Sequence, residues 1–423
     1  MNIELAYGDG LLALELPADR ATVVRPAYRQ PAADEFAAVV EALRRPVAGS
    51  PLRDLVRAGQ TVAISVCDGT RPQPRRIVIP AILEELDAVI PLGDVLILVA
   101  TGTHRGNSEE ELRQMLGPEV VDSVRVVNHD ARDKASLVWL GRLGADVPVW
   151  LNRAWVEADV RITTGFVEPH FFAGFSGGPK MVAPGLAGLE TTLTLHDAAR
   201  IGHANARWGV TDGNPVHDDV RAIAAATGTD FALDVIIDGE KRIVQAFGGE
   251  LFAVHRAACA AAKATAMCPV LELFDVVVTS NSGFPLDQNL YQAVKGMSAA
   301  AQVVKPGGLI VCAAECRDGF PDHGSYRSEL TASSSPQRLL DSIVARTETV
   351  PDQWQIQIQA GIQARARVVM HTSSLSDDDL AEAHLEQTHD VEATVRAGLA
   401  AAGPSARVCV LPDGPQTIPY VAA

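Results

Sequence analysis

Short apolar runs rich in valine and isoleucine alternate along this chain with longer segments of helical composition. Each run is too short and too evenly apolar for an amphipathic helix, so it predicts a buried strand. The expected strands are Val62–Val66, Val95–Val99, Val124–Val127, Val160–Thr163, Val276–Thr279, Leu309–Ala313, Val368–His371 and Val408–Leu411. The expected helices are Arg76–Val89, Asp218–Ala226, Leu251–Ala264, Tyr291–Val304, Asp377–Glu386 and Val391–Ala401.

This alternation predicts an α/β protein with mostly parallel, Rossmann-like sheets flanked by helices. Because 423 residues are too many for one ordinary core, we expect two domains, with the active site in the cleft between them. The expected division is an N-terminal α/β domain over residues 1–262, a crossover over residues 263–274 and a C-terminal α/β domain over residues 275–390. The helix and strand within residues 391–423 fit either domain.

Composition excludes several classes of protein. The 52 acidic and 36 basic residues give a net charge of −16, which repels nucleic acid backbones. No apolar stretch reaches the ~20 residues that span a membrane, and the N-terminus has no basic or apolar leader, so we expect a cytoplasmic protein. The six cysteines show no paired spacing and are expected to be reduced.

Polar turns follow the predicted strands. Four of them are Asp68–Pro72, Thr101–His104, Asn128–Asp130 and Glu168–His170. Three more, later in the chain, are Ser280–Gly283, Arg317–Gly319 and Pro412–Gly414. Ligands bind at the carboxyl ends of parallel strands, so these turns are expected to line one ligand site.

The densest segment is a glycine-rich stretch that leads to Lys180. Gly174, Gly177 and Gly178 permit close backbone approach to a ligand, and their N–H groups suit a phosphate. Pro179 before the lysine and the methionine after it rule out a Walker A loop, which disfavours a nucleotide triphosphatase. Lys180 is therefore either a solvated lysine on a glycine turn or an attachment point for a covalent cofactor.

Three histidines are candidates for chemistry. His104 and His170 lie just beyond strands, and each is either a proton-transfer group or the cap of a turn. His196 is either a metal ligand or a hydrogen-bonded core histidine. Because no second ligand stands near it at a familiar spacing, a metal at His196 would need ligands from elsewhere.

Other candidates carry charge or hydrogen-bonding groups near strand ends. Arg71 offers a planar fork for a carboxylate, or is a surface arginine paired with Asp68. Tyr291, Gln292 and Lys295 begin a predicted helix, and ordinary helix surface is the alternative reading for each.

In their order and spacing, from Asp68 to the closing Pro412–Pro415 segment, these residues resemble the lactate racemase family. Members of that family hold a nickel-pincer nucleotide, a pyridinium-3,5-bisthiocarboxylic acid mononucleotide with nickel, between two α/β domains. The resemblance implies that Lys180 is joined covalently to this cofactor and that His196 is the single protein ligand to nickel. The cofactor itself would then supply the ligands that His196 lacks.

The resemblance also assigns the remaining candidates. It implies that His104 and His170 are the acid and base on the two faces of the substrate carbon. Arg71, Gln292 and Lys295 are implied to bind the substrate carboxylate. The residues implied to lie near the cofactor or the substrate are Asp68, Gly174, Ser176, Gly177, Gly178, Tyr291 and Trp354.

The implied activity is racemisation or epimerisation of a 2-hydroxy acid by proton-coupled hydride transfer, with the cofactor made by separate synthesis enzymes. Typical members are expected to have a more glycine- and arginine-rich loop than the one that contains Pro179 here. This departure puts contacts between the loop and the cofactor phosphate in doubt more than it does covalent attachment at Lys180.

There are two alternative functions. One is a pyridine-nucleotide-dependent 2-hydroxyacid dehydrogenase, although no Gly-x-Gly-x-x-Gly motif follows a strand, and the other is a non-catalytic ligand-binding protein. Which 2-hydroxy acid is used, and whether copies form a homo-oligomer, stay open.

Overall fold

The computed structural model describes residues 1–321 and 324–422, which divide into two compact units. The N-terminal unit comprises Tyr28–His196 and Asn205–Lys263. The C-terminal unit comprises Met1–Ala27, Asp197–Ala204 and the chain from Ala264 onward. The first 27 residues therefore depart from the expected domain over residues 1–262, because the strand Ala21–Val23 pairs with a strand near the C-terminus.

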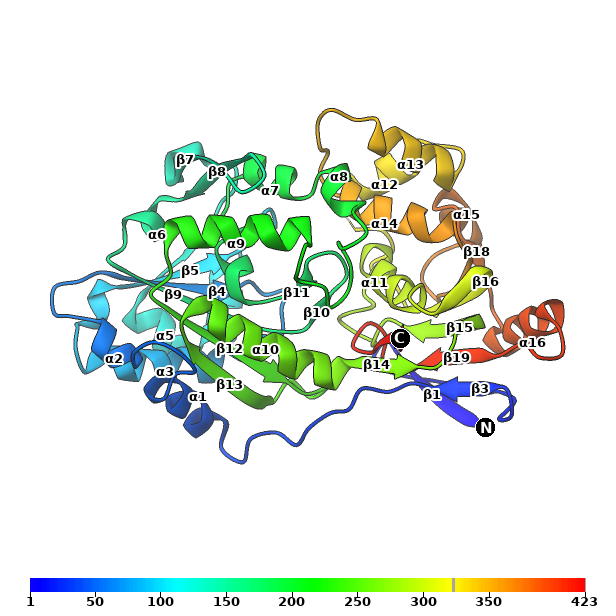
Figure 1. The fold of residues 1–423 in the computed structure, drawn as a ribbon, viewed down its shortest axis with the longest axis horizontal. Helices are drawn as coiled ribbons and strands as arrows, with labels where there is room; N and C mark the ends of the chain where they lie inside the picture. Colours follow the sequence, from blue (N-terminus) through cyan, green and yellow to red (C-terminus); the bar gives the residue numbers. More distant parts are fainter. Residues whose placement is uncertain (322–323, 423) are drawn as a thin grey trace. The chain divides into compact units, whose positions relative to one another are not determined.

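A six-stranded sheet forms the centre of the N-terminal unit (Figure 1). Its order is β13-β12-β9-β4-β5-β6, and only β13 runs antiparallel to its neighbour. The strands are β4 (Val62–Cys67), β5 (Val95–Ala100), β6 (Arg125–Asn128), β9 (Val160–Phe166), β12 (Phe231–Ile237) and β13 (Ile243–Gly249). Two hairpins lie outside the sheet: β7 (Leu137–Leu143) with β8 (Val147–Asn152), and β10 (Pro169–His170) with β11 (Gly174–Phe175).

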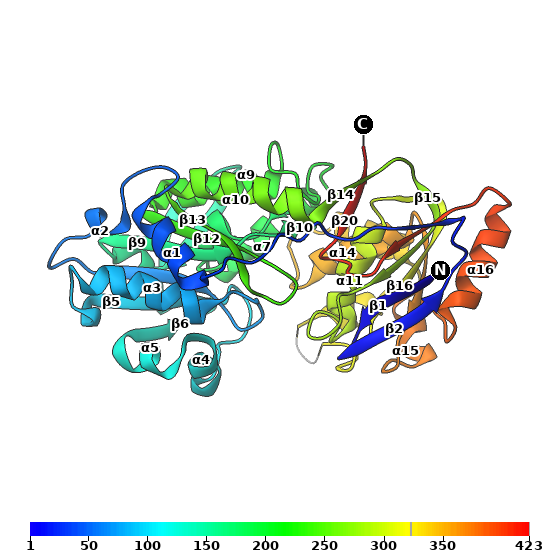
Figure 2. The ribbon, with the colours of Figure 1, turned by 90° about the horizontal axis from the view of Figure 1, so that it is seen from below.

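Helices cover both faces of this sheet. In Figure 2, α9 (Pro215–Thr227) and α10 (Leu251–Ala266) lie on one side of the strands, and α1 (Glu35–Arg44) and α3 (Arg75–Asp87) lie on the other. The other helical segments are α2 (Leu52–Leu55), η1 (Leu92–Asp94), α4 (Glu109–Leu116), α5 (Pro118–Ser123), η2 (Lys134–Ser136), α6 (Arg153–Glu157), η3 (Gly178–Met181) and α7 (Leu189–Leu195).

The two faces of the sheet differ in chemistry. On one face, alternate residues such as Ile64, Ile162 and Leu233 join an apolar core with α1 and α3. The opposite face of the same strands carries small or polar residues, including Ser65, Gly165 and Asp234. The segment η3 lies on this second face, where Ser65 Oγ donates to the Met181 carbonyl oxygen at 2.8 Å. Polar positions within buried strands thus make room and hydrogen-bond partners for the turn around Lys180.

The C-terminal unit is built on a second six-stranded sheet, which is parallel throughout. Its order is β18-β17-β16-β15-β19-β3. The strands are β3 (Ala21–Val23), β15 (Phe274–Ser280), β16 (Val304–Ala313), β17 (Arg367–His371), β18 (Glu386–Gln387) and β19 (Val408–Leu411). The strand that fitted either domain, β19, therefore belongs to the C-terminal unit, next to β15.

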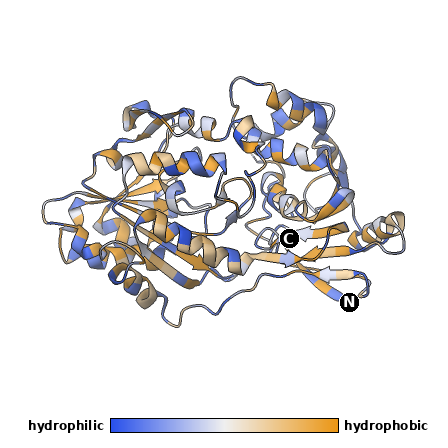
Figure 3. Ribbon diagram, in the orientation of Figure 1, coloured by the Kyte–Doolittle hydropathy of each residue, from blue (hydrophilic) through white to orange (hydrophobic). Residues whose placement is uncertain are grey.

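Two strand pairs and seven helices complete the described part of the C-terminal unit. The pairs are β1 (Asn2–Tyr7) with β2 (Gly10–Glu15), and β14 (Met267–Val270) with β20 (Ile418–Val421). The helices are α8 (Ala198–Ile201), α11 (Leu290–Ala300), α12 (Tyr326–Leu330), α13 (Pro336–Val344), α14 (Gln353–Gln363), α15 (Asp377–Glu382) and α16 (Val391–Ala402). Figure 3 shows that the hydrophobic residues concentrate in the strands of both sheets.

The expected α/β class, with mostly parallel sheets flanked by helices, is confirmed, and each of the eight expected strands is present. Six of them agree with the expected bounds within two residues, whereas β9 ends three residues later and β16 begins five residues earlier than expected. The sequence did not predict β12 and β13 of the N-terminal sheet, or β3 and β18 of the C-terminal sheet. In β12, the buried Asp234 interrupts an otherwise apolar run and hides the strand pattern. Among the described residues, no helix combines the length and apolarity that crossing a membrane requires.

Candidate functional site

The turns after β4, β5 and β9 gather at one edge of the N-terminal sheet. Strand β4 lies between β5 and β9, and all three are parallel. The chain leaves β6 on one side of β4 and returns as β9 on the other, so the strand order reverses at β4. Ligands of open parallel sheets bind at such a reversal.

The turns after β4 and β5 meet through a hydrogen bond between Asp68 and His104. Asp68 Oδ2 lies 2.7 Å from His104 Nδ1. Asp68 is buried, whereas the His104 side chain is 45% exposed. Burial raises the pKa of Asp68, but the hydrogen bond and charge of His104, with help from Arg71 and Thr70, bring it down to about 2. The ionised carboxylate only accepts, so Nδ1 of His104 carries a proton and its Nε2 is left to accept one.

The shape of the turn after β4 depends on two buried side chains. Gln73 accepts a hydrogen bond from the Cys67 N–H at 2.9 Å, and Arg75 Nη1 donates to the carbonyl oxygens of Cys67, Asp68 and Arg71. Burial lowers the pKa of Arg75. Arg71 Nη1 donates to Thr70 Oγ1 at 3.1 Å, and its charge helps to lower the pKa of Asp68.

His170 lies in the two-residue strand β10 and has the opposite hydrogen-bonding arrangement to His104. Its Nδ1 accepts the Ala173 backbone N–H at 3.3 Å. In the neutral ring the proton therefore lies on Nε2. His104 thus presents an acceptor and His170 a donor at the same ring position, which is the complementarity that two-sided proton transfer needs.

Phe172 brings three of the candidate residues together. Its ring is buried and lies 4.5 Å from the His170 ring and 5.2 Å from the His196 ring, edge-on in both cases. The Lys180 Nζ lies 5.7 Å from the centre of the same ring. His170, Lys180 and His196 are therefore neighbours around one aromatic side chain.

His196 caps the C-terminal end of α7 and is buried. Its Nδ1 lies 2.7 Å from the Thr192 carbonyl oxygen, which accepts, so Nε2 is the nitrogen with the lone pair that suits a metal. Within residues 1–321 and 324–422, no cluster of three or more His, Cys, Asp or Glu side chains that could hold a metal is found. A metal at His196 therefore fits only if a bound group brings most of the ligands, which is the donor set of a pincer cofactor.

The glycine-rich turn is packed tightly against the protein. A Cβ at Gly174 would lie 2.2 Å from the Val210 carbonyl oxygen. Ser176 Oγ accepts from the Glu168 N–H and donates to the Phe166 carbonyl oxygen, which closes the loop on itself. The Gly178 N–H donates inward to Asp234 at 3.1 Å, so this N–H is already engaged and is not directed at a phosphate.

Four candidates of the C-terminal unit meet on α11 and α14. Trp354 Nε1 donates to Tyr291 Oη at 3.1 Å, and Lys295 Nζ donates to Gln292 Oε1 at 2.7 Å. Asn289 caps α11 by accepting the Gln292 N–H. The two pairs place an aromatic surface and an ammonium–amide group at the start of α11.

Several residues that support the site were not predicted from the sequence. The buried Asn214 caps α9 with its oxygen and donates its amide to the Phe172 carbonyl oxygen. Asp234 and His255 contact the glycine-rich turn from inside the protein. A short polar residue before a proline at a helix start, as in Asn214–Pro215, is the one signal that sequence offered.

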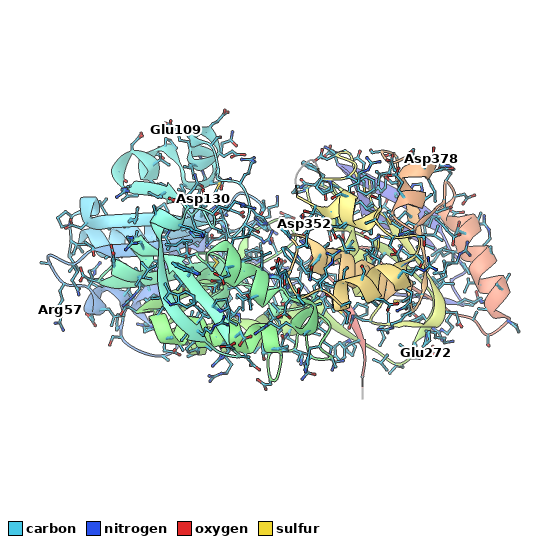
Figure 4. The ribbon with its side chains drawn as sticks, turned by 90° about the horizontal axis from the view of Figure 1, so that it is seen from above. Arg57, Glu109, Asp130, Glu272, Asp352 and Asp378 are labelled. Carbon is cyan, nitrogen blue, oxygen red and sulfur yellow. The ribbon has the colours of Figure 1, made fainter. Side chains whose placement is uncertain are left out.

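The buried carboxylates differ from the bulk of the acidic residues. Arg57 and Glu109, labelled in Figure 4, are exposed at the periphery of the N-terminal unit, as most charged residues are. Asp68, directly after β4, and Asp234, in the middle of β12, are instead buried. The acidic surplus is thus a surface property, and these two carboxylates have specific partners.

Comparison with known proteins gives matches along nearly the whole chain. The model of the lactate racemase N-terminal domain matches residues 7–209, and that of the C-terminal domain matches residues 272–418. A lactate racemase of Thermoanaerobacterium thermosaccharolyticum is 36% identical over 423 residues, covering 99% of both chains. One from Lactiplantibacillus plantarum is 36% identical over 378 residues, covering 89% of both chains.

Solved structures agree with these matches. The lactate racemase apoprotein from Thermoanaerobacterium thermosaccharolyticum superposes with a TM-score of 0.93 at 35% identity, covering 99% of this chain and 100% of that one. A Thermotoga maritima protein superposes with a TM-score of 0.69 at 18% identity, covering 92% and 98% of the two chains. The second match concerns the fold alone.

Proposed function

This chain belongs to the lactate racemase family and is an isomerase, and from that premise we propose that it interconverts the enantiomers of a 2-hydroxy acid, with lactate as the first expected substrate. A racemase acts on a small molecule. Racemisation through a planar 2-keto acid needs a group that takes the hydroxyl proton of one enantiomer as its α-hydrogen leaves as hydride, and a group that returns a proton to that oxygen as hydride comes back to the other face.

The observation that carries this proposal is the complementary hydrogen bonding of the two histidines. His104 Nδ1 bonds to Asp68, which leaves Nε2 as an acceptor, and His170 Nδ1 accepts from Ala173, which leaves Nε2–H as a donor. His104 would take the hydroxyl proton of one enantiomer as the keto acid forms, and His170 would give a proton to the keto oxygen as the other enantiomer forms. The roles exchange in the reverse direction.

Asp68 has a separate part in this scheme. When His104 takes a proton, the ring becomes a cation next to a carboxylate whose pKa is about 2 and which stays ionised. The carboxylate orients the ring and stabilises its charged form, as in other carboxylate–histidine pairs. Asp68 is thus proposed to orient a proton-transfer residue and not to transfer the proton itself.

The substrate carboxylate needs fixed positive charge. We assign this binding to Arg71, whose planar fork suits a carboxylate, and to Lys295 with its partner Gln292. Lys295 and Gln292 already hold each other at 2.7 Å, so their polar heads are positioned before substrate arrives.

The residues around Phe172 fit the cofactor that the family resemblance implies. Lys180 would attach a nickel-pincer nucleotide covalently, and His196 Nε2 would be the protein ligand to nickel. When bound, this group supplies acceptance and return of a hydride, so that no pyridine nucleotide is required. The residues proposed to lie against the cofactor or the substrate are Asp68, Gly174, Ser176, Gly177, Gly178, Tyr291 and Trp354.

The cofactor would come from separate synthesis enzymes, so the proposal is tested on protein produced together with them. Pure L-lactate and pure D-lactate are each incubated with the enzyme without added NAD, and the product is resolved by chiral chromatography. We expect both to approach the same mixture. A requirement for NAD, with pyruvate accumulating, would favour a dehydrogenase, and no conversion of any 2-hydroxy acid tested would favour a binding protein.

A further inference from the structure

The glycine-rich turn before Lys180 is held from the interior by two buried side chains that are distant in sequence. His255 of α10 donates from Nε2 to the Ser176 carbonyl oxygen at 3.0 Å. Asp234 of β12 accepts the Gly178 N–H at 3.1 Å. The two contacts lie on either side of Gly177, and neither residue takes part in the proton chemistry described above.

The backbone of this turn is shaped to meet those side chains. Gly177 and Gly178 have φ angles of 69° and 52°, in the left-handed region that favours glycine. A Cβ at Gly178 would lie 2.4 Å from the His255 ring. The bare backbone therefore rests directly on the imidazole, with no room for a side chain between them.

The two contacts also have opposite polarity. A carbonyl oxygen needs a donor and an N–H needs an acceptor, and here one buried residue supplies each. Burial lowers the pKa of His255 to about 4, so its ring is neutral and carries one N–H, which the carbonyl places on Nε2. His217 stacks on this ring at 5.5 Å, and burial lowers the pKa of His217 to about 3, so its ring is neutral as well.

We propose that His255 and Asp234 are positioning residues that clamp the turn Ser176–Gly178 and thereby fix the point from which the Lys180 side chain leaves the backbone. The Lys180 N–H donates to the Gly177 carbonyl oxygen at 3.2 Å, so the geometry of the turn passes directly to the lysine. The importance of a placed Lys180 rests on the proposed function. The clamp itself is a property of the polypeptide alone.

Amide hydrogen exchange on the full-length apoprotein tests the clamp. His255→Leu removes the donor and Asp234→Leu removes the acceptor, so each leaves a buried backbone group without its partner. We expect the peptide covering residues 174–181 to exchange at least about tenfold faster in each variant. His255→Gln and Asp234→Asn keep a donor and an acceptor, and we expect them to stay within roughly threefold of the wild type.

A matched control lies in the other unit. His371 Nδ1 bonds to the Thr388 carbonyl oxygen at 3.0 Å, so His371→Leu removes the same kind of contact away from the turn. We expect the peptide over residues 174–181 to exchange as in the wild type. Unchanged exchange in both leucine variants of the clamp, or equal acceleration in His371→Leu, would overturn the proposal.

If a leucine variant does not fold, Gly178→Ala carries the test, because its Cβ would collide with His255. The same acceleration is expected, and wild-type exchange would contradict the clamp. A second readout is the fraction of Lys180 modified after production with the cofactor-synthesis enzymes. It should fall at least about tenfold in the clamp variants, while the KM of the molecules that do carry cofactor stays unchanged. A wild type without modification would refute the proposed function and leave the clamp to be judged by exchange.

Discussion

The two units hold their candidate residues in different ways. In the N-terminal unit, His104, His170 and His196 lie on turns or at a helix end, and each uses Nδ1 to bond a carboxylate or a backbone group. In the C-terminal unit, Tyr291, Gln292, Lys295 and Trp354 lie on helices, and two hydrogen bonds among them join side chain to side chain. A carboxylate or backbone partner at Nδ1 fixes the tautomer of a ring, which proton transfer and metal binding need. Side-chain pairs position polar groups in advance, which suits binding of a substrate.

The largest expected effect concerns the two histidines. His104→Gln and His170→Gln remove a titrating group but keep a polar side chain, so we expect kcat for lactate racemisation to fall about 10² to 10⁴-fold. Initial rates in both directions, measured by chiral chromatography, check this. His389→Gln, an exposed histidine of the C-terminal unit, is the control. Full turnover in either variant would show that the rings with fixed tautomers are not the proton-transfer groups.

The second effect concerns the stability of the N-terminal unit. Burial raises the pKa of Asp234 to about 7, although the Gly178 N–H opposes the shift. Below about pH 4 the carboxyl is protonated in both the folded and the unfolded chain, so it costs nothing. As pH rises to 7 the unfolded form ionises first, so the folded state loses stability. Asp234→Asn does not suffer this loss. The free energy of unfolding of the variant minus that of the wild type should therefore be about 3 to 4 kcal/mol larger at pH 8 than at pH 4.

Chemical denaturation of the wild type and of Asp234→Asn across this pH range measures the difference. A difference that does not change with pH would mean that Asp234 ionises normally in the folded protein. The result shows whether the N-terminal unit loses stability by burying the carboxylate that holds its glycine-rich turn.

A third effect separates orientation from proton transfer. Asp68→Asn can hold the His104 ring in the wrong tautomer and cannot stabilise its cation, so we expect kcat to fall about 10²-fold with little change in KM. The folded pKa of Asp68 is about 2 against an ordinary 3.8, so its stabilisation is present above pH 4 and is lost as pH falls to 2. This loss, about 2 kcal/mol, should be absent in Asp68→Asn when both proteins are denatured chemically at low pH. An unchanged kcat would show that Asp68 does not orient His104.

The smallest effect is expected in the C-terminal unit. Lys295→Met removes the ammonium but keeps the length of the side chain, so KM for lactate should rise about tenfold or more, with a smaller change in kcat. Lys305→Met is a matched control, because Lys305 forms an exposed ion pair with Asp275 at 2.8 Å. A fall in kcat with unchanged KM would contradict the role of Lys295 in substrate binding.

Sequence predicted the parallel sheets because their strands are continuous apolar runs, and it predicted the family from ordered motifs. It did not predict β12, because the buried Asp234 breaks the apolar pattern, and a single sequence does not show that a backbone N–H will contact this carboxylate. The grouping of His170, Lys180 and His196 around Phe172 likewise depends on the folding of a loop. His104 was predicted from its place after a strand, whereas its bond to Asp68 needed the register of two turns.

The central claim is that Lys180 carries a covalent cofactor whose nickel is bound by His196. Intact mass and metal analysis on protein made together with the cofactor-synthesis enzymes test it most directly, with Lys180→Ala and His196→Ala alongside. We expect an added mass on Lys180 and nickel close to one atom per chain in the wild type, no added mass in Lys180→Ala, and added mass with little nickel in His196→Ala. An unmodified Lys180 without nickel in the wild type, under conditions that load a known lactate racemase, would contradict it.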